Sequence, residues 1–197
     1  MAKSRTTKPI QWKEAKKCLA YLESEKQYHF LLTLAIGFYT GYRVSDLLEL
    51  KYSDFQKDLL HIRERKTTKQ RDLPVFPEIR RIVEWCRTEQ LKQEDDFIFT
   101  RARYRSRQPI TKAAFINRVK AAFEFCGLKF KNISAHTLRK TFALHYYSLM
   151  EKRVGSHRAL IETAKILNHS NVEVTRRYIG IDEVTKEEVL AAWDLEF

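Results

Sequence analysis

Residues 134–178 contain side chains of the types that could attack a phosphodiester. They are His136, Arg139, His169, Arg176, Arg177 and Tyr178. A tyrosine hydroxyl titrates at about pH 10 in water, so at neutral pH it is a weak nucleophile. It needs a base, nearby positive charge, or both, and two histidines with an arginine can supply them. The segment therefore predicts nucleophilic attack by Tyr178 on a phosphate ester.

Three further segments carry cations in positions that could contact the same phosphate. Arg43 follows Gly41 at the expected start of a helix, which places it at a rim, and Lys66 lies near the tip of an expected β-hairpin. The densest cationic run surrounds Tyr104 and contains Arg101, Arg103, Arg105 and Arg107. Such a run is typical of a phosphate-binding loop, although many are only solvated surface.

Composition favours a polyanionic partner. The chain has 197 residues, with 37 Lys and Arg against 25 Asp and Glu, a formal net charge of +12. Nucleic acid is the first expectation from this excess, and a merely solvated basic face is the alternative. The three cysteines are widely spaced, which favours neither a disulfide framework nor a zinc site. No apolar run approaches the roughly 20 residues of a membrane span, so we expect a cytoplasmic protein without membrane contact.

The hydrophobic pattern predicts one mainly helical domain with a small antiparallel β-sheet, an α+β fold. Residues 1–9 read as a flexible basic arm and residues 10–197 as the domain. Helices are expected from residue 10, over residues 28–39, after Pro77, after Thr111, over residues 134–150 and over 159–167. Strands over residues 59–64 and 71–75 form the hairpin. An extended piece over residues 95–100 and a short last helix capped by Thr185 and Glu188 complete the pattern.

Four separated motifs resemble those of the tyrosine recombinases, the phage integrase family. They are T-G-Y-R-V-S-D-L-L-E-L, K-T-T-K-Q-R-D-L-P-V, H-T-L-R-K-T-F and L-N-H-S-N-V-E-V-T-R-R-Y-I-G-I, which extend in order from residue 40 to residue 181. The resemblance implies the catalytic domain of a site-specific DNA recombinase acting in integration, inversion or excision. It also implies cleavage through a 3′-phosphotyrosyl intermediate, without a metal ion or other cofactor.

Position by position, the resemblance implies a role for each matching residue. Catalytic roles fall to Arg43, Lys66, His136, Arg139, His169 and the nucleophile Tyr178. Asp46 is the implied supporting carboxylate for Arg43, and Lys66 the acid that protonates the leaving oxygen. DNA contacts are expected at Lys69, Arg71, Arg101, Arg103, Arg105, Arg107, Lys140, Arg176 and Arg177. Asn168 stands where the family usually has glycine, and asparagine tolerates the left-handed backbone better than most residues.

The resemblance also implies partners and leaves alternatives open. Double-stranded DNA is the expected substrate, bound by a homotetramer whose subunits can be monomers in solution. Residues 161–181 also resemble a helix-turn-helix, so a non-catalytic DNA-binding protein is one alternative. A type IB topoisomerase, which relaxes DNA by similar chemistry, is another. Few residues precede Arg43, as in the catalytic-domain-only fimbrial-switch invertases, so no N-terminal core-binding domain is expected, unless the chain is a trimmed piece.

Overall fold

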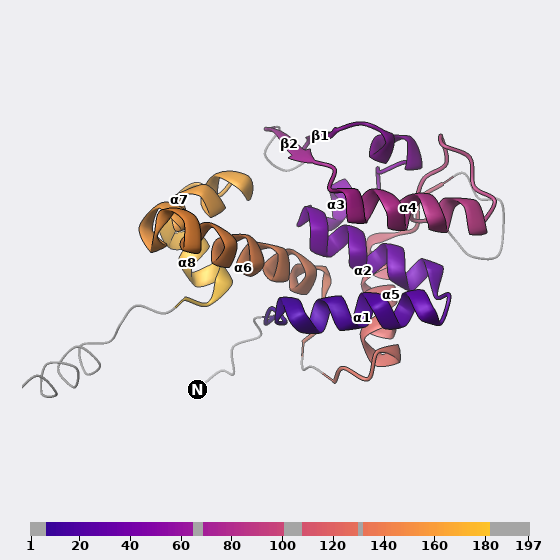
Figure 1. Cartoon of the computed structure of the whole chain (residues 1–197), viewed down its shortest axis with the longest axis horizontal. Helices are drawn as coiled ribbons and strands as arrows, with labels where there is room; N and C mark the ends of the chain where they lie inside the picture. Colours follow the sequence, from indigo (N-terminus) through magenta and orange to yellow (C-terminus); the bar gives the residue numbers. More distant parts are fainter. Residues whose placement is uncertain (1–6, 65–68, 101–107, 130–131, 182–197) are drawn as a thin grey trace, which may run out of the picture.

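The computed structural model describes residues 7–64, 69–100, 108–129 and 132–181. Its elements follow one another along the chain as drawn in Figure 1. They are α1 (Trp12–Ser24), α2 (Tyr28–Thr40), α3 (Val44–Leu47), the 3-10 helix η1 (Tyr52–Gln56), β1 (Leu59–Arg63), β2 (Gln70–Pro74), α4 (Pro77–Glu89), α5 (Lys112–Phe125), α6 (Ala135–Val154), α7 (Ser156–Ile166) and α8 (Val172–Ile179). The expected fold, mainly helical with one small antiparallel sheet, is confirmed.

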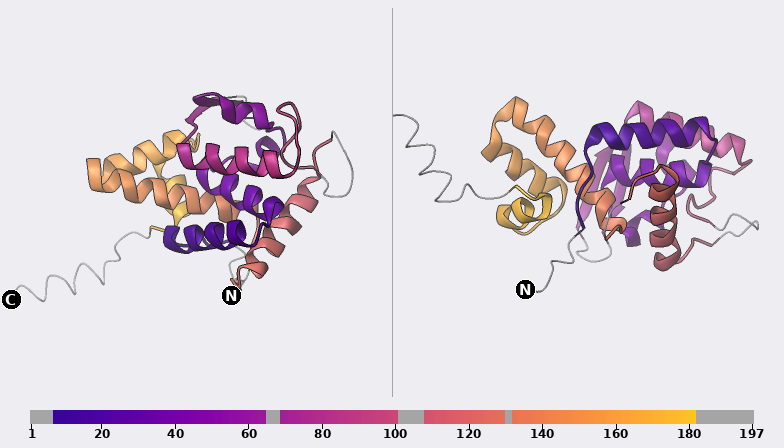
Figure 2. Two further views of the ribbon diagram at one scale, coloured as in Figure 1. Left: turned by 45° about the vertical axis from the view of Figure 1, so that its right-hand side comes forward. Right: turned by 90° about the horizontal axis from the view of Figure 1, so that it is seen from below.

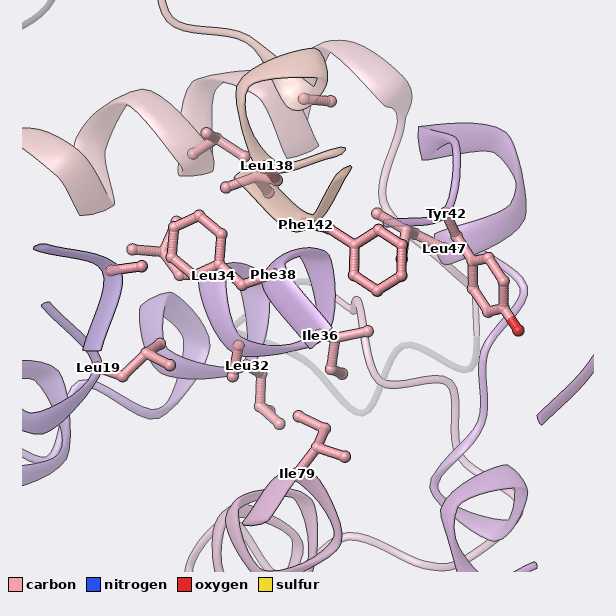
Figure 3. Packing of buried hydrophobic residues seen from close by; sticks show 14 of the residues in the cluster. Leu19, Leu32, Leu34, Ile36, Phe38, Tyr42, Leu47, Ile79, Leu138 and Phe142 are labelled. Carbon is pink, nitrogen blue, oxygen red and sulfur yellow. The ribbon is translucent and has the colours of Figure 1, made fainter. Parts of the chain in front are cut away.

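Helix α2 occupies the centre of the core because it is apolar on nearly every side. Nine of its thirteen residues are buried. In Figure 3, Leu34 and Phe38 face Leu138 of α6, while Ile79 of α4 approaches the opposite side. A helix without a polar face needs neighbours all round, and α2 packs against α1, α4, α5 and α6. The expected central buried helix is therefore confirmed.

Two glycines allow α6 to lie directly against α2. A Cβ atom at Gly37 would lie 2.4 Å from Cδ1 of Leu138, and one at Gly41 would lie 2.3 Å from Cδ1 of Phe142. Gly41 also ends α2 in the left-handed conformation, with φ of 57°, which glycine adopts at little cost. The helix break expected at residues 40–41 therefore also sets the distance between two central helices.

The β-hairpin pairs Leu59 with Pro74 and Arg63 with Gln70. Leu60 and Leu73 are buried, so the hairpin turns an apolar face toward the core. Its tip, residues 65–68, lies outside the described residues. The extended piece expected over residues 95–100 is not a strand but one isolated bridge between Lys51 and Phe97. One paired position is too short to extend the sheet.

Helix α6 connects this core to α7 and α8, which both pack against it (Figures 1 and 2). Ser134 caps α6 by accepting a hydrogen bond from the His136 backbone N–H, at 3.1 Å. Thr111 caps α5 in the same way, as expected, and Pro77 begins α4. The helix expected around residues 185–193 lies outside the described residues. Within the described ranges, no helix has both the length and the apolar character that a bilayer crossing requires.

Candidate functional site

Arg139 joins three segments that are distant in the sequence. It lies in the second turn of α6 and is only 3 % exposed. One of its guanidinium nitrogens donates to the Gly41 carbonyl at 2.7 Å, and the other donates to the Leu167 carbonyl at 2.7 Å. Gly41 lies two residues before Arg43, and Leu167 lies two residues before His169. Arg139 therefore brings the loops carrying Arg43 and His169 to the first turns of α6.

Arg43 forms an ion pair with Glu64, which is fully buried at the end of β1. Its backbone is extended and directly precedes α3, so the side chain leaves the helix at its N-terminal end. The second oxygen of Glu64 lies 4.0 Å from Nη1 of Arg139. One buried carboxylate thus lies between the two arginines that the resemblance singles out. The motif comparison missed Glu64, although the alternation of β1 predicts that it faces inward with Leu60.

Asp46, the carboxylate expected to support Arg43, is also buried, with 2 % exposure. Its Oδ1 accepts a hydrogen bond from the Ser45 hydroxyl at 3.1 Å. Burial lowers the pKa of Arg139, while the charges of Tyr178, Glu64 and Asp46 act in the opposite direction. Asp46 therefore belongs to the same electrostatic cluster as Glu64, which forms an ion pair with Arg43.

His169 lies in a turn whose geometry depends on the residue before it. Asn168 has φ of 53°, so asparagine adopts the expected left-handed conformation. Nδ1 of His169 lies 2.9 Å from the hydroxyl of Thr175, which is itself fully buried. Burial lowers the pKa of His169 to about 4, and Arg139 and Arg43 act in the same direction. The imidazole is therefore neutral near pH 7, and a donated Thr175 proton would leave the hydrogen on Nε2.

Tyr178 lies on α8 with its ring edge against His169, at 5.1 Å between ring centroids. Nζ of Lys140 lies 5.1 Å from the centroid of the Tyr178 ring. Burial raises the pKa of the Tyr178 hydroxyl to about 12, and the charges of Arg139 and Arg43 only partly oppose this. The nearby Arg139 guanidinium favours the phenolate. Within the described part of the chain, however, no hydrogen bond of ordinary geometry reaches the Tyr178 hydroxyl. The phenol is therefore protonated at neutral pH.

An open cleft of about 560 Å³ gives access to this cluster. Its lining residues are Thr7, Ser134, His136, Lys140, Val174, Arg177 and Tyr178. His136 is exposed at the start of α6, so its imidazole lines the same cleft as Tyr178. The cleft is thus lined by Tyr178, by a candidate base and by two cations, Lys140 and Arg177, while the Tyr178 hydroxyl itself is buried.

The remaining predicted residues fall into three groups. Lys69 and Arg177 are exposed, and Arg176 lies 3.7 Å from Glu173. Arg71 differs from the expectation of a DNA contact, because it is 4 % exposed and donates to the Thr40 carbonyl at 2.7 Å. Its guanidinium also lies over the Tyr42 ring at 4.6 Å, so it packs inside the domain. Lys66 and the run Arg101, Arg103, Arg105 and Arg107 lie outside the described residues.

Comparison with known proteins finds a matching family model and several related chains. The model of the phage integrase family matches residues 8–184. A probable integrase/recombinase, YoeC of Bacillus subtilis (strain 168), is 36% identical over 166 residues, which cover 83% of each chain. A tyrosine recombinase of Pseudothermotoga lettingae is 28% identical over 88% of this chain, but only 56% of its own length is covered.

Solved structures with the same fold include several recombinases. The XerA recombinase has a TM-score of 0.68 and 20% identity, with 100% of this chain and 66% of that chain covered. A lambda integrase dimer bound to a COC′ core site has a TM-score of 0.65 and 23% identity over 91% of this chain and 61% of that chain. A lambda integrase tetramer bound to a Holliday junction has a TM-score of 0.63 and 23% identity, with 90% and 49% covered.

Proposed function

Because this chain belongs to the phage integrase family, we propose that it is a tyrosine-type site-specific recombinase that cleaves and rejoins DNA strands. The observation that supports this most directly is the position of Tyr178. Its hydroxyl is buried beside Arg139 and within electrostatic range of Arg43, and the residue lines a cleft that is open to solvent. We also propose that residues 10–197 form the catalytic domain, that residues 1–9 act as a basic arm, and that the protein works in the cytoplasm, on the nucleoid if its source is bacterial.

In the proposed reaction, the Tyr178 oxygen attacks the scissile phosphorus and the bond from phosphorus to the 5′-oxygen breaks. The phenolic proton passes to His136, which lines the same cleft. The departing 5′-oxygen takes a proton from Lys66. The product is a 3′-phosphotyrosyl bond, and a 5′-hydroxyl from another strand can reverse each of these steps. The energy of the phosphodiester is conserved, so no nucleotide cofactor is needed.

The arginines and His169 would stabilise the charge that develops on the non-bridging phosphate oxygens. Fixed donors contribute most when they are already in place, because the protein does not have to reorganise during the reaction. Arg139 is held by two carbonyls and Arg43 by Glu64, so both guanidinium groups are oriented. A guanidinium presents a planar, permanently charged set of donors that suits phosphate geometry. His169 would add a neutral Nε2–H donor.

The proposed partners are double-stranded DNA and three further copies of the chain. Strand exchange between two duplexes requires four cleavage events and hence four active sites. The net charge of +12 favours binding to a polyanion. Lambda integrase, which shares the fold, has been solved as a dimer on a core site and as a tetramer on a Holliday junction.

A covalent-trapping experiment tests the proposal. The protein is incubated with nicked duplex DNA carrying its recombination site, found by selection from random duplexes, and the adduct is mapped by mass spectrometry of the linked peptide. Wild type should form an adduct at Tyr178, Tyr178→Phe should form none, and Tyr21→Phe at the exposed face of α1 should behave as wild type. An adduct that persists in Tyr178→Phe would overturn the assignment of the nucleophile.

A type IB topoisomerase would form the same covalent bond, so the adduct alone does not separate the two activities. Two labelled duplexes of different length separate them. A recombinase should produce strands of mixed length, whereas a topoisomerase should rejoin each strand only within its own duplex. A non-catalytic helix-turn-helix protein would bind DNA and form no adduct at all.

A further inference from the structure

Glu64 is placed where β1 meets the charged cluster. It directly follows β1 and faces inward, on the same side of the hairpin as Leu60 and Arg71. Its backbone N–H donates to the Lys69 carbonyl at 3.0 Å, so it belongs to the stem of the hairpin. The inward face of the hairpin is therefore apolar near the core and charged at Glu64 and Arg71.

The charge balance explains why a carboxylate is needed at this position. Burial lowers the pKa of Arg71 and of Arg139, and neighbouring guanidinium groups act in the same direction. Arg139 and Arg43 act on Arg71, and Arg43 acts on Arg139. Like charges repel strongly where water is excluded, and Arg71 and Arg139 are 4 % and 3 % exposed. Glu64 interacts favourably with all three guanidinium groups. Without it, the least buried of them, Arg43, would move outward toward water.

We propose that Glu64 is a positioning residue for strand cleavage, which holds the Arg43 guanidinium in its reactive orientation and fixes it relative to the hairpin stem. This inference rests on the proposed function. The side chain of Arg43 is 22 % exposed whereas that of Glu64 is completely buried. Glu64 therefore holds the guanidinium from the inside and leaves its outer edge available to a phosphate.

The ion pair also connects two parts of the proposed site. Arg43 lies between α2 and α3, and Glu64 lies two residues before Lys66 in the sequence. The Arg71 guanidinium attaches the second strand to the same place, through the Thr40 and Gly41 carbonyls at 2.7 and 3.4 Å. Both strands of the hairpin are thus tied to the segment that carries Arg43.

The test compares Glu64→Gln, which removes the charge but keeps the shape, with Glu124→Gln on the exposed face of α5. Cleavage of nicked site DNA, DNA affinity and thermal unfolding are measured for each. Glu64→Gln should cleave about 10–100-fold more slowly, the range typical for residues that orient an active-site group, with little change in affinity. Glu64→Asp, which keeps the charge on a shorter side chain, should recover part of the rate and should fold if the uncharged variant does not.

A double-mutant cycle separates positioning from a general structural role. If Glu64 acts through Arg43, then Glu64→Gln should change the rate by no more than about twofold when Arg43 is already alanine. The inference would be overturned if Glu64→Gln reduced the cleavage rate equally in wild type and in Arg43→Ala. It would also be overturned if the rate fell only as much as the fraction of folded protein. If wild type cleaves and Glu64→Gln cleaves equally fast, the positioning role of Glu64 is overturned, while the proposed function stands.

The mobility of the Arg43 guanidinium can be measured without DNA, and this measurement does not depend on cleavage. In DNA-free protein labelled with ¹⁵N-arginine, the Arg43 guanidinium signals are identified by their absence from Arg43→Lys. Wild type and Glu124→Gln should show an immobilised guanidinium, and Glu64→Gln should show a freely rotating one. Unchanged signals in Glu64→Gln would contradict the proposal whatever the activity.

Discussion

Arg43 and Arg139 are both expected to stabilise charge on the phosphate, but only Arg139 also donates hydrogen bonds to two backbone carbonyls within the described part of the chain. Both are expected to act mainly on charge that develops in the transition state, so alanine should reduce cleavage far more than DNA binding. Loss of one such donor typically costs about 10²–10³ in rate. Single-turnover cleavage and DNA affinity of Arg43→Ala and Arg139→Ala test this. Equal losses in rate and affinity would indicate ordinary phosphate contacts instead.

Arg139→Ala should in addition lower the free energy of unfolding. Its removal leaves the Leu167 carbonyl without its buried donor and the Gly41 carbonyl with only the longer bond from Arg71, at 3.4 Å. A buried group that loses its partner costs about 1–3 kcal/mol. Urea denaturation of the DNA-free protein measures the difference. Arg139→Lys is the control for charge, because lysine keeps the cation but cannot reach both carbonyls with a planar group.

We expect Thr175 to set which nitrogen of His169 carries the proton, because its hydroxyl lies 2.9 Å from Nδ1. Thr175→Val, which keeps the shape and removes the hydroxyl, should slow cleavage about 10–100-fold because the imidazole loses its orienting partner. Thr175→Ser should retain most of the rate. The ¹⁵N shifts of His169 in DNA-free protein report the tautomer directly, and an unchanged tautomer in Thr175→Val would contradict this role.

Among the elements, the contact between α2 and α6 depends on glycine. Gly41→Ala should destabilise the protein by about 2–5 kcal/mol, since overpacking costs about 1–3 kcal/mol and left-handed backbone about 1–2 kcal/mol. Gly180 is a matched control, because it ends α8 with φ of 76° but a Cβ atom there would meet no other atom within 4 Å. Gly180→Ala should therefore cost only the backbone part. If urea denaturation showed the same loss of unfolding free energy for Gly41→Ala and Gly180→Ala, close packing at Gly41 would not be the cause.

The hairpin is the second element with a testable role, because it carries the expected general acid. A 5′-bridging phosphorothiolate expels a thiolate, which needs no proton, so this substrate should restore cleavage to Lys66→Ala. It should not restore cleavage to Arg43→Ala, whose loss has another cause. Lys69→Ala is the comparison within the same hairpin. Rescue of Lys69→Ala alone would assign the role to Lys69.

At the scale of the whole molecule, the C-terminal residues 188–197 are expected to contribute to assembly of the tetramer. Residues 188–197 include Val189, Leu190, Trp193, Leu195 and Phe197, a large apolar set for so short a segment. We expect this set to pack on a neighbouring subunit in the DNA-bound tetramer, since exposed apolar patches favour association. Deletion of residues 188–197 should preserve binding or cleavage at a single site and abolish the higher-order complex in native gels and sedimentation. If the segment packs on its own domain instead, the deletion should lower the melting temperature of the DNA-free monomer.

Local sequence was sufficient for the features that depend on neighbouring residues. Helical periodicity, the break at Gly41, the cap at Thr111 and the left-handed Asn168 all follow from backbone preferences within a few positions. The order and spacing of four motifs also identified the family, because those motifs recur as short segments. The central position of α2 could be predicted as well, since a helix that is apolar all round must be buried.

Only the tertiary structure decided how the charged groups pair. Arg139 donates to Gly41, 98 positions away, and Arg43, just before α3, pairs with Glu64, just after β1. Arg71 lies inside the domain, although it reads as one basic residue among many. Charge and periodicity indicate which side of an element a residue occupies, but they do not indicate which opposite charge or carbonyl lies there. That partner is set by the packing of α2, α6 and the hairpin, because burial makes an unpaired charge costly wherever the three elements meet.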